Sequence, residues 1–437
     1  MNFFWKNKKV LIFGLGVLGG GVGVTKFFAK NGAKVTVTDL KNKKELQPSI
    51  AKLKQFDIRY VFGGHSEADF RSHDLIVRNP AVPTDSPFAK IAKAAGIPIE
   101  MEASLFFMLT PTKKIIGITG TKGKTTTTLL IAKILQQAKF KTVIAGTPQH
   151  SMLAQLEKIT PDTWVVLELS SWQLESLASH QISPHIAVLT NIFPDHLNRY
   201  RTIEDYISAK KIIFQFQGKN DFFITSADWQ ITKKLAIEAK SQVVFFSKDT
   251  IHPNLAKSIR LKGNHNLANF GAAYKVAKVL GISDDIIGKT LENFEGIPDH
   301  LEDIEKINGI TFINDTTATI PDATIAALNT FDAPIILICG GSDKNLDFSE
   351  FTKVVNRKAK AVVLLEGTAT DKIEKGLYAR KILGRLSDFE KAVRVAFQAA
   401  SLGDVILLSP GAASFGMFKN EFDRGEQFKR IVRDLAN

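Results

Sequence analysis

Residues 117–128, GITGTKGKTTTT, combine the residue types that bind the phosphates of a nucleotide. Gly120 and Gly123 have no side chain, so backbone N–H groups there could approach phosphate oxygens closely. Lys124 would place a positive charge on the β- and γ-phosphates, and the hydroxyl of Thr125 would be a ligand for Mg²⁺. The segment therefore predicts a loop that binds ATP together with magnesium.

The spacing of this loop differs from that of the common phosphate-binding loop. The pattern G-x-x-x-x-G-K-[ST] would require a glycine at Ile118, but the glycine stands one place earlier, at Gly117. The apolar run KKIIGIT precedes the loop and predicts a strand, and a helix is expected from Thr125 to Gln137. The strand and the helix support a nucleotide loop, and the spacing indicates a variant form of it.

Two further residues stand where strands are expected to end. Glu168 ends the apolar run TWVVLEL, and His196 follows the strand HIAVL within TNIFPDHLNRY. Active sites of open α/β sheets lie at the carboxyl ends of the strands. A carboxylate and an imidazole at that edge are candidate catalytic residues and ligands for the metal of the nucleotide, although a lone histidine is more often structural.

A second glycine motif lies near the N-terminus. Gly14, Gly16 and Gly19 form G-x-G-x-x-G between a predicted strand, Lys9 to Phe13, and a predicted helix, and Asp39 ends the next strand, KVTVTD. This arrangement predicts a diphosphate at the start of a helix, with a carboxylate near a ribose. The motif does not specify NAD, and a tight turn with close helix packing would also account for the glycines.

Short apolar runs alternate with helical patterns along the whole chain, which is typical of parallel sheets with crossover helices. The pattern starts afresh at KKVLIFGLG, at KKIIGITG and at ITFIND. In the last part, PIILICGG, AVVLLEG and DVILLSPG are further expected strands. We therefore predict an α/β fold in three parts, with boundaries near residue 112 and near Pro298.

The composition narrows the class of protein. The single cysteine, Cys339, rules out a disulfide framework and disfavours a cysteine-based metal site. The formal charge of +13 is spread over dispersed lysines, which favours phosphate-bearing small molecules over nucleic acid. No run reaches the ~20 apolar residues of a membrane span, and six glycines make the N-terminal run a poor signal peptide. We expect a cytoplasmic protein that does not insert into membranes.

Several segments together resemble the Mur ligases. TGTKGKTT, LELSSWQLE, TNIFPDHLNRY, SAKKIIF, GNHNLAN, GGSDKNLDF and LSPGAASFGMFKNEFDRGEQF occur here in the order seen in that family. The resemblance covers essentially the whole chain, from Gly14 to Gly425. The resemblance implies three domains: a Rossmann-like UDP-binding domain over residues 1–112, a P-loop ATPase-like domain over residues 113–298 and a Rossmann-like amino-acid-binding domain over residues 299–437. In this family Gly117 belongs to the strand that leads into the nucleotide loop.

The resemblance also implies site residues. Lys124, Glu168, His196 and Lys210 would be catalytic, and the metal would be held by Thr125, Glu168, His196 and Lys210. The UDP-binding residues would be Gly14, Gly16, Val17, Leu18, Gly19 and Asp39. The ATP-binding residues would be Gly120, Thr121, Lys122, Gly123, Lys124, Thr125, Thr126, Thr127, Asn266, Asn269 and Asp315. The incoming amino acid would contact Thr319, Lys344 and Ser414.

Lys210, in the segment SAKK, is a metal ligand in this scheme only if it is carbamylated, since carbamylation turns the amine into a carboxylate. Its neighbour Lys211 is the weaker candidate. From the sequence alone Lys210 is an ordinary helix lysine.

The implied reaction is an ATP-dependent amide ligation by a monomer. ATP would phosphorylate the free carboxylate of UDP-N-acetylmuramoyl-L-alanine, and the amine of glutamate would attack the acyl phosphate, as in peptidoglycan precursor synthesis. The C-terminal pattern points to the branch of the family that adds D-glutamate. ATP and Mg²⁺ are the expected cofactors, and closure of the third domain would exclude water.

Some positions depart from the pattern of that branch. Thr317 stands where a lysine is common, Asp299 and His300 stand where His-Arg is usual, Thr147 replaces an asparagine, and Glu421 stands where a phenylalanine is found. These departures leave open a relative that adds L-glutamate. Another Mur ligase or a folylpolyglutamate-type ligase is a further alternative. A different class, an NAD-dependent oxidoreductase, would use the first glycine motif but would leave Lys124 and Glu168 unexplained.

Overall fold

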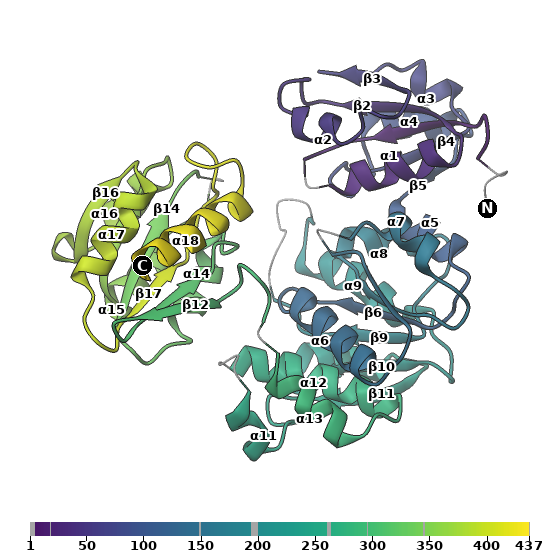
Figure 1. Ribbon diagram of the computed structural model, residues 1–437. Helices are drawn as coiled ribbons and strands as arrows, with labels where there is room; N and C mark the ends of the chain where they lie inside the picture. The colour runs from purple at the N-terminus through teal and green to yellow at the C-terminus, as the bar shows by residue number, and fades with distance from the viewer. Residues whose placement is uncertain are drawn as a thin grey trace. The chain divides into compact units, whose positions relative to one another are not determined.

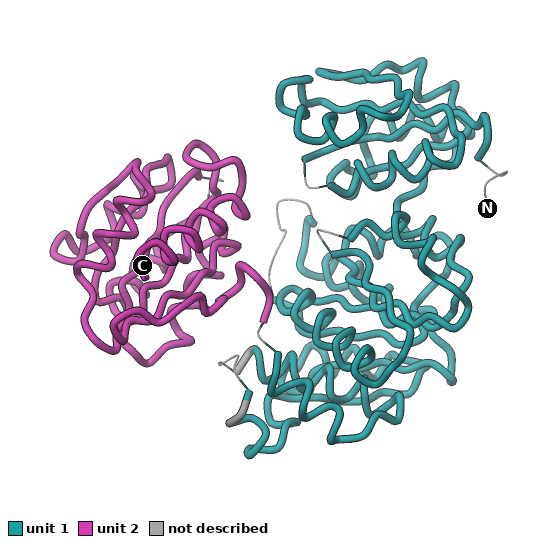
Figure 2. The backbone as a smooth tube through the Cα atoms, viewed as in Figure 1, with its two compact units in different colours: residues 1–260, 264–294 teal, residues 261–263, 295–437 magenta. Residues whose placement is uncertain are grey.

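The computed structural model describes residues 5–17, 19–147, 150–193, 200–259, 264–294, 296–343 and 346–436. The chain divides into two compact units, residues 1–260 with 264–294 and residues 261–263 with 295–437 (Figure 2). The first unit contains two sheets and the second contains one. The predicted α/β class is confirmed, and the domain boundaries near residues 112 and 298 stay predictions.

The first sheet has five parallel strands in the order β3-β2-β1-β4-β5. Its strands are β1 (Lys9–Phe13), β2 (Lys34–Asp39), β3 (Ile58–Phe62), β4 (Leu75–Arg78) and β5 (Ile99–Glu100), and its helices are α1 (Gly20–Lys30), α2 (Gln47–Ala51), α3 (Asp69–Ser72) and α4 (Pro87–Ala94) (Figure 1). Strand β1 lies in the middle and is buried after its first residue, as expected for a parallel strand covered on both faces. The predicted strand over residues 9–13 is therefore confirmed.

The second sheet has six parallel strands in the order β11-β10-β9-β6-β8-β7. Its strands are β6 (Ile115–Thr119), β7 (Thr142–Ala145), β8 (Trp164–Glu168), β9 (Ile186–Leu189), β10 (Phe222–Ser226) and β11 (Gln242–Phe246). The helices of this part are α5 (Glu102–Leu109), α6 (Lys124–Gln137), α7 (Met152–Gln155), α8 (Ser171–Ala178), α9 (Ile203–Gln215), α10 (Gln230–Ile237), α11 (Pro253–Ser258), α12 (Asn264–Val279) and α13 (Asp284–Glu292), with the 3₁₀ helix η1 (Leu156–Lys158). Gly117 lies inside β6, where a Cβ atom would come within 2.6 Å of the Pro184 ring, so the early glycine has a packing reason.

The third sheet belongs to the second unit and has the order β12-β13-β17-β14-β15-β16. Its strands are β12 (Glu302–Ile307), β13 (Ile310–Asn314), β14 (Ile335–Gly340), β15 (Ala359–Leu365), β16 (Ile382–Leu386) and β17 (Val405–Leu408). Its helices are α14 (Pro321–Leu328), α15 (Ser349–Lys358), α16 (Thr370–Gly376), α17 (Phe389–Ala399) and α18 (Glu421–Ala436), with the 3₁₀ helix η2 (Ala379–Lys381). Only the β12–β13 pair is antiparallel among the described strands of this sheet.

Alternate residues of β14 separate the core of the second unit into two layers. Ile335 and Leu337 pack with α14, α15 and α16, whereas Ile336 and Ile338 pack with α17 and α18. Because successive side chains of a strand point to opposite faces, helices must cover both sides of this sheet.

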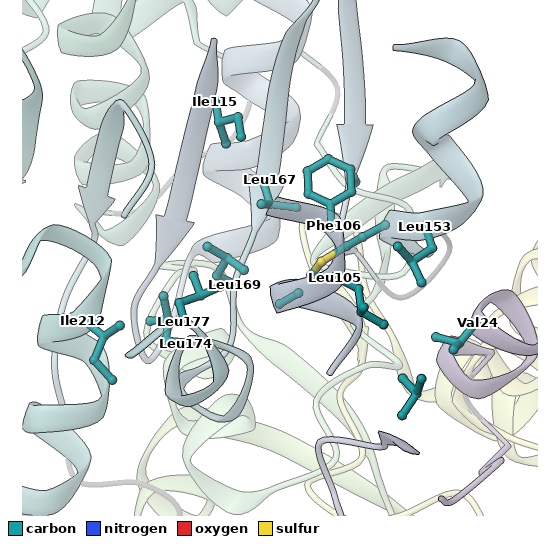
Figure 3. Packing of buried hydrophobic residues seen from close by; sticks show 14 of the residues in the cluster. Val24, Leu105, Phe106, Ile115, Leu153, Leu167, Leu169, Leu174, Leu177 and Ile212 are labelled. Carbon is teal, nitrogen blue, oxygen red and sulfur yellow. The ribbon is translucent and has the colours of Figure 1, made fainter. Parts of the chain in front are cut away.

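In the first unit one hydrophobic cluster continues from α1 through α5 and α7 to the second sheet. Figure 3 shows part of it, with Val24 of α1, Phe106 of α5, Leu153 of α7 and Leu167 of β8. The first two sheets therefore share one continuous hydrophobic core. None of the described helices is long and apolar enough to cross a membrane.

Candidate active site

The predicted nucleotide loop connects β6 to α6 at the carboxyl edge of the second sheet. Gly123 is the residue before the helix and has φ of +81°, and α6 begins at Lys124. A Cβ atom on Gly120 would lie 1.8 Å from Thr190 Oγ1, and one on Gly123 would lie 2.2 Å from Asn269 Oδ1. Neither position has room for a side chain, so the loop keeps its backbone accessible at the helix N-terminus, where anions bind favourably.

Lys124 folds back over this loop. Its Nζ atom donates to the carbonyl oxygens of Gly120 at 3.1 Å and of Thr121 at 3.2 Å. These two contacts hold the ammonium group above the backbone at the helix start. A phosphate bound there would meet a positive charge that is already in position.

Glu168, the last residue of β8, lies beside Thr125. The Thr125 hydroxyl donates to Glu168 Oε2 at 2.8 Å. Burial raises the pKa of the Glu168 carboxyl, while the positive charge of Lys124 and the Thr125 hydrogen bond act in the opposite direction. A hydroxyl and a carboxylate in contact are hard oxygen donors of the kind that Mg²⁺ prefers.

The described residues contain no group of three or more histidine, cysteine, aspartate or glutamate side chains that could hold a metal. Thr125 and Glu168 fit a magnesium ion that takes its remaining ligands from phosphate oxygens and water, which is common for this metal. His196, the other predicted ligand, lies outside the described residues.

The side chain of Lys210, on α9, reaches the same loop. Its side chain is 1% exposed, and Nζ donates to Gly120 O at 2.9 Å and lies 4.7 Å from the centre of the Tyr206 ring. Lys211, one residue later, forms a surface ion pair with Glu238 instead. Of the two adjacent lysines, the structure brings Lys210 to the nucleotide loop.

The remaining predicted ATP residues of this unit lie in or next to the loop. Asn269 of α12 accepts a hydrogen bond from Thr127 Oγ1 at 3.4 Å, and Asn266 on the same helix is buried. Thr121 is buried, Thr126 is half-buried and Lys122 is exposed.

The sequence did not predict the residues that fix the loop from neighbouring elements. Asn191, after β9, accepts from Lys122 N at 2.9 Å and donates to Lys122 O at 3.0 Å, and Thr190 Oγ1 donates to the same carbonyl at 2.7 Å. The Tyr206 hydroxyl lies 3.1 Å from Thr121 Oγ1. The signal for Asn191 was the polar pair Thr-Asn at a strand end, next to the strand that carries the loop.

The first glycine loop is organised around Asp39. Gly14, Gly16 and Gly19 all have positive φ, +96°, +61° and +98°. Asp39 Oδ2 accepts from Leu15 N at 2.8 Å and from Gly16 N at 2.9 Å. This oxygen of the predicted ribose-binding carboxylate thus holds the loop backbone.

Of the two other predicted UDP contacts, Val17 and Leu18, the structure describes only the first. Val17 is 45% exposed at the tip of the first glycine loop, where a ligand could reach it. Leu18 lies outside the described residues.

In the second unit, Thr319 and Ser414 follow the neighbouring strands β13 and β17. Gly411 N donates to Ala318 O at 2.8 Å, so the two loops lie side by side at the carboxyl edge. The third predicted amino-acid residue, Lys344, lies outside the described residues.

Asp315, a predicted ATP residue, is also at this edge of the second unit. It accepts from Ser409 Oγ at 2.7 Å and from Leu301 N at 3.2 Å, and burial raises its pKa to about 7. Burial therefore makes this carboxyl group a weaker acid than an exposed aspartate.

Three family descriptions match successive parts of the chain. The N-terminal domain of MurD-like Mur ligases matches residues 8–100, the Mur ligase middle domain matches residues 118–288, and the glutamate ligase domain of Mur ligases matches residues 301–411. The matches follow the order of the three sheets.

The chain is similar over its full length to curated proteins named UDP-N-acetylmuramoylalanine–D-glutamate ligase. It is 44% identical to the one from Roseiflexus sp. (strain RS-1), covering 98% of this chain and 99% of the relative. It is 39% identical to the one from Borreliella afzelii (strain PKo), covering 99% of each, and 36% identical to the one from Acetivibrio thermocellus, covering 98% and 97%.

Solved structures with the same fold include two ligases from Thermotoga maritima. UDP-N-acetylmuramate–alanine ligase (MurC) has a TM-score of 0.64 at 20% identity, covering 98% of this chain and 100% of that one. MurF ligase, solved in complex with ADP, has a TM-score of 0.60 at 16% identity, covering 100% and 97%.

Proposed function

This chain belongs to the Mur ligase family, and from that premise we propose that it joins D-glutamate to UDP-N-acetylmuramoyl-L-alanine at the expense of ATP, in peptidoglycan synthesis. The observation that carries the proposal is the full-length similarity to the D-glutamate ligases. The contacts of Lys124, Thr125 and Glu168 at the nucleotide loop support it, since they supply what phosphoryl transfer needs.

The first step is transfer of the γ-phosphoryl group of ATP to the carboxylate of the L-alanyl group, which gives an acyl phosphate and ADP. Loop N–H groups around Gly120 and Gly123 hold the phosphates, and Lys124 neutralises the charge that develops on them. Thr125 and Glu168 would hold Mg²⁺, which when bound neutralises and orients phosphate oxygens.

In the second step the amine of glutamate attacks the acyl carbon, and inorganic phosphate leaves from the tetrahedral intermediate as the amide forms. Thr319, Lys344 and Ser414 would bind the glutamate, and Asn266, Asn269 and Asp315 would complete the ATP site. Thr319 and Ser414 stand on adjacent loops at the edge of the third sheet, which supports a shared ligand.

Lys210 would act as a carbamate. The ammonium group loses one proton, CO₂ adds to the neutral amine and a second proton is released, so that a carboxylate takes the place of the ammonium group. The position of Lys210 supports this assignment, because its buried side chain ends at the carbonyl oxygen of Gly120 in the nucleotide loop. His196 would complete the metal site.

The first glycine loop would hold the UDP part of the substrate through Gly14, Gly16, Val17, Leu18 and Gly19. Asp39 would act through the loop that it braces. Residues 1–112, 113–298 and 299–437 would then be the UDP-, ATP- and amino-acid-binding domains. A cytoplasmic location fits a reaction that consumes ATP.

The decisive experiment supplies the purified protein with ATP, Mg²⁺ and UDP-N-acetylmuramoyl-L-alanine, adds D-glutamate, L-glutamate or other amino acids in turn, and measures phosphate release. We expect release with D-glutamate and a matching amide product by mass spectrometry. Release with L-glutamate alone would assign the other enantiomer. Hydride transfer with a nicotinamide cofactor and no phosphate release would refute ligation.

A further inference from the structure

Two side chains from separate segments of the second unit, His300 and Thr317, form a hydrogen bond. Thr317 Oγ1 and His300 Nδ1 lie 2.8 Å apart. Both residues stand at positions where the sequence departs from the pattern of the D-glutamate-adding branch. Two positions that depart from the pattern and lie apart in the sequence are therefore in contact in the structure.

The protons of this contact can be assigned because Thr317 has a second partner. Its Oγ1 atom also lies 2.8 Å from the carbonyl oxygen of Asp299. A carbonyl oxygen only accepts, so the single hydroxyl proton of Thr317 goes to Asp299. The lone pair that remains faces His300 Nδ1, which must then carry a hydrogen and donate it. In the neutral ring, Nε2 is left without a proton and is a hydrogen-bond acceptor.

The Asp299 carbonyl is fixed in direction by the packing around its own residue. Asp299 has φ of +70°, in the left-handed region that non-glycine residues seldom adopt. Its carboxylate accepts from Asn314 Nδ2 at 2.8 Å and pairs with Lys429 Nζ at 3.2 Å. Gly425 makes room for it, since a Cβ atom there would lie 2.3 Å from Asp299 Oδ1. The surrounding structure therefore holds the strained residue, and through it Thr317 and the imidazole ring.

The surroundings of His300 favour an N–H donor as its partner. His300 is an exposed residue, so a ligand can approach its ring. The ionisable side chains in contact with this turn or with its ion pairs include five carboxyl groups and two cations: Asp299, Glu302, Asp315, Glu421 and Glu426, with Lys429 and Arg424. An excess of carboxyl groups attracts a positively charged amino group and repels an anion.

The loop of Thr317 also leads to a residue assigned to the incoming amino acid. Thr319 N donates to Thr317 O at 2.9 Å, in the same turn. We propose that the neutral Nε2 of His300 accepts a hydrogen bond from the amino group of the incoming glutamate, and that Thr317 is a positioning residue that holds the ring in this tautomer. This inference rests on the proposed ligase function.

The tautomer is tested by ¹⁵N–¹H correlation NMR on labelled full-length protein, at a pH where the imidazole is neutral. We expect the His300 ring to carry its proton on Nδ1 in the wild type and in Thr317→Ser, which keeps the hydroxyl. Thr317→Val, which has nearly the same shape without the hydroxyl, should move the proton to Nε2. A wild-type ring protonated on Nε2 would overturn the role of Thr317, whether or not the protein ligates glutamate.

The ligand is tested by steady-state kinetics of the same variants. Loss of one hydrogen bond at the amino group should raise the KM for glutamate on the order of tenfold in Thr317→Val and in His300→Ala. The KM values for ATP and for the UDP substrate should stay within about twofold, and Thr317→Ser should behave like the wild type. A rise in the KM for ATP instead would assign the ring to the nucleotide and refute the proposal. A wild type without glutamate-dependent phosphate release would refute the ligase function itself, and the NMR result would still decide the tautomer.

Discussion

The first unit holds two glycine loops that each follow a strand and open a helix, and each has one carboxylate close by. Asp39 accepts two backbone N–H groups of the first loop, Leu15 and Gly16, through one oxygen. Glu168 contacts the second loop through the hydroxyl of Thr125, and burial raises its pKa. Asp39 thus stabilises the backbone of the first loop. Glu168 is instead hydrogen-bonded to the Thr125 side chain, and a metal could replace that hydrogen bond.

The difference supports separate proposed roles for the two similar loops. The first loop has no lysine at its helix start, which reads GGVGV after Gly19. The second loop has Lys124 and Thr125 at its helix start, and the buried side chain of Lys210 donates a hydrogen bond to the carbonyl oxygen of Gly120. A glycine loop alone provides an anion site, and the added cation and oxygen ligands make phosphoryl transfer possible. Four variants test this division, from the largest expected effect to the smallest.

Lys124→Ala should separate the two loops most sharply. We expect ligation to fall by about 10³-fold or more, because the charge on the transferring phosphoryl group loses its fixed cation. Binding of the UDP substrate, measured by calorimetry, should change by less than about twofold, because in our proposal that ligand uses the first loop.

Lys141→Ala is the matched control for Lys124→Ala. It removes the same charge at the amino edge of the second sheet, just before β7, and should leave ligation unchanged. Loss of UDP-substrate binding in Lys124→Ala would contradict separate sites for the two nucleotides.

The fold could be predicted where local patterns decide it. The runs KVLIF and IIGIT are apolar and bounded by turns, and they form β1 and β6. Strands β3, IRYVF, and β16, ILGRL, were not predicted, because they lie at sheet edges, are half-buried and mix polar with apolar residues.

The same limit applies to the candidate site. The sequence could single out Lys124 and Glu168 because a motif marks the first and a strand end marks the second. The contact of Asn191 with Lys122, or of His300 with Thr317, depends on which strands become neighbours, and no spacing in the sequence encodes that.

Lys210→Ala tests whether the second loop depends on a carboxylate made from lysine. Ligation should fall by about 10²-fold, and a short carboxylate such as formate or acetate in solution should restore part of it, by taking the place of the carbamate beside the metal. Lys211→Ala, which removes a neighbouring surface charge paired with Glu238, should retain full activity. Full activity of Lys210→Ala without rescue would remove the carbamate from the mechanism.

Asp39→Ala tests the bracing role in the first loop. Leu15 N, which is buried, and Gly16 N, which is partly buried, would lose their acceptor, which should lower the free energy of unfolding by about 1–3 kcal/mol. The affinity for the UDP substrate should fall, while the rate of phosphoryl transfer at saturating substrate should not. Urea denaturation and calorimetry measure the first two, with Asp57→Ala on the exposed surface as control. An unchanged free energy of unfolding in Asp39→Ala would show that the Asp39 carboxylate contributes to ligand binding and does not stabilise the loop.

Glu168→Gln tests the second carboxylate through the pH dependence of stability in the absence of Mg²⁺. Burial raises the pKa of Glu168 above its ordinary value of 4.5 in the folded protein. Between that value and the folded pKa, the unfolded chain has lost the proton and the folded chain keeps it, so the free energy of unfolding falls as the pH rises. Glutamine cannot titrate, so the variant should gain stability relative to the wild type as the pH rises through this window, with no difference in slope below it.

Adding Mg²⁺ should stabilise only the wild type, because the ion favours the carboxylate. Glu157→Gln, at an exposed position, should follow the wild type throughout. Parallel curves for Glu168→Gln and the wild type would mean that the carboxyl titrates normally, and the contrast with the first loop would then rest on Lys124 and Thr125 alone.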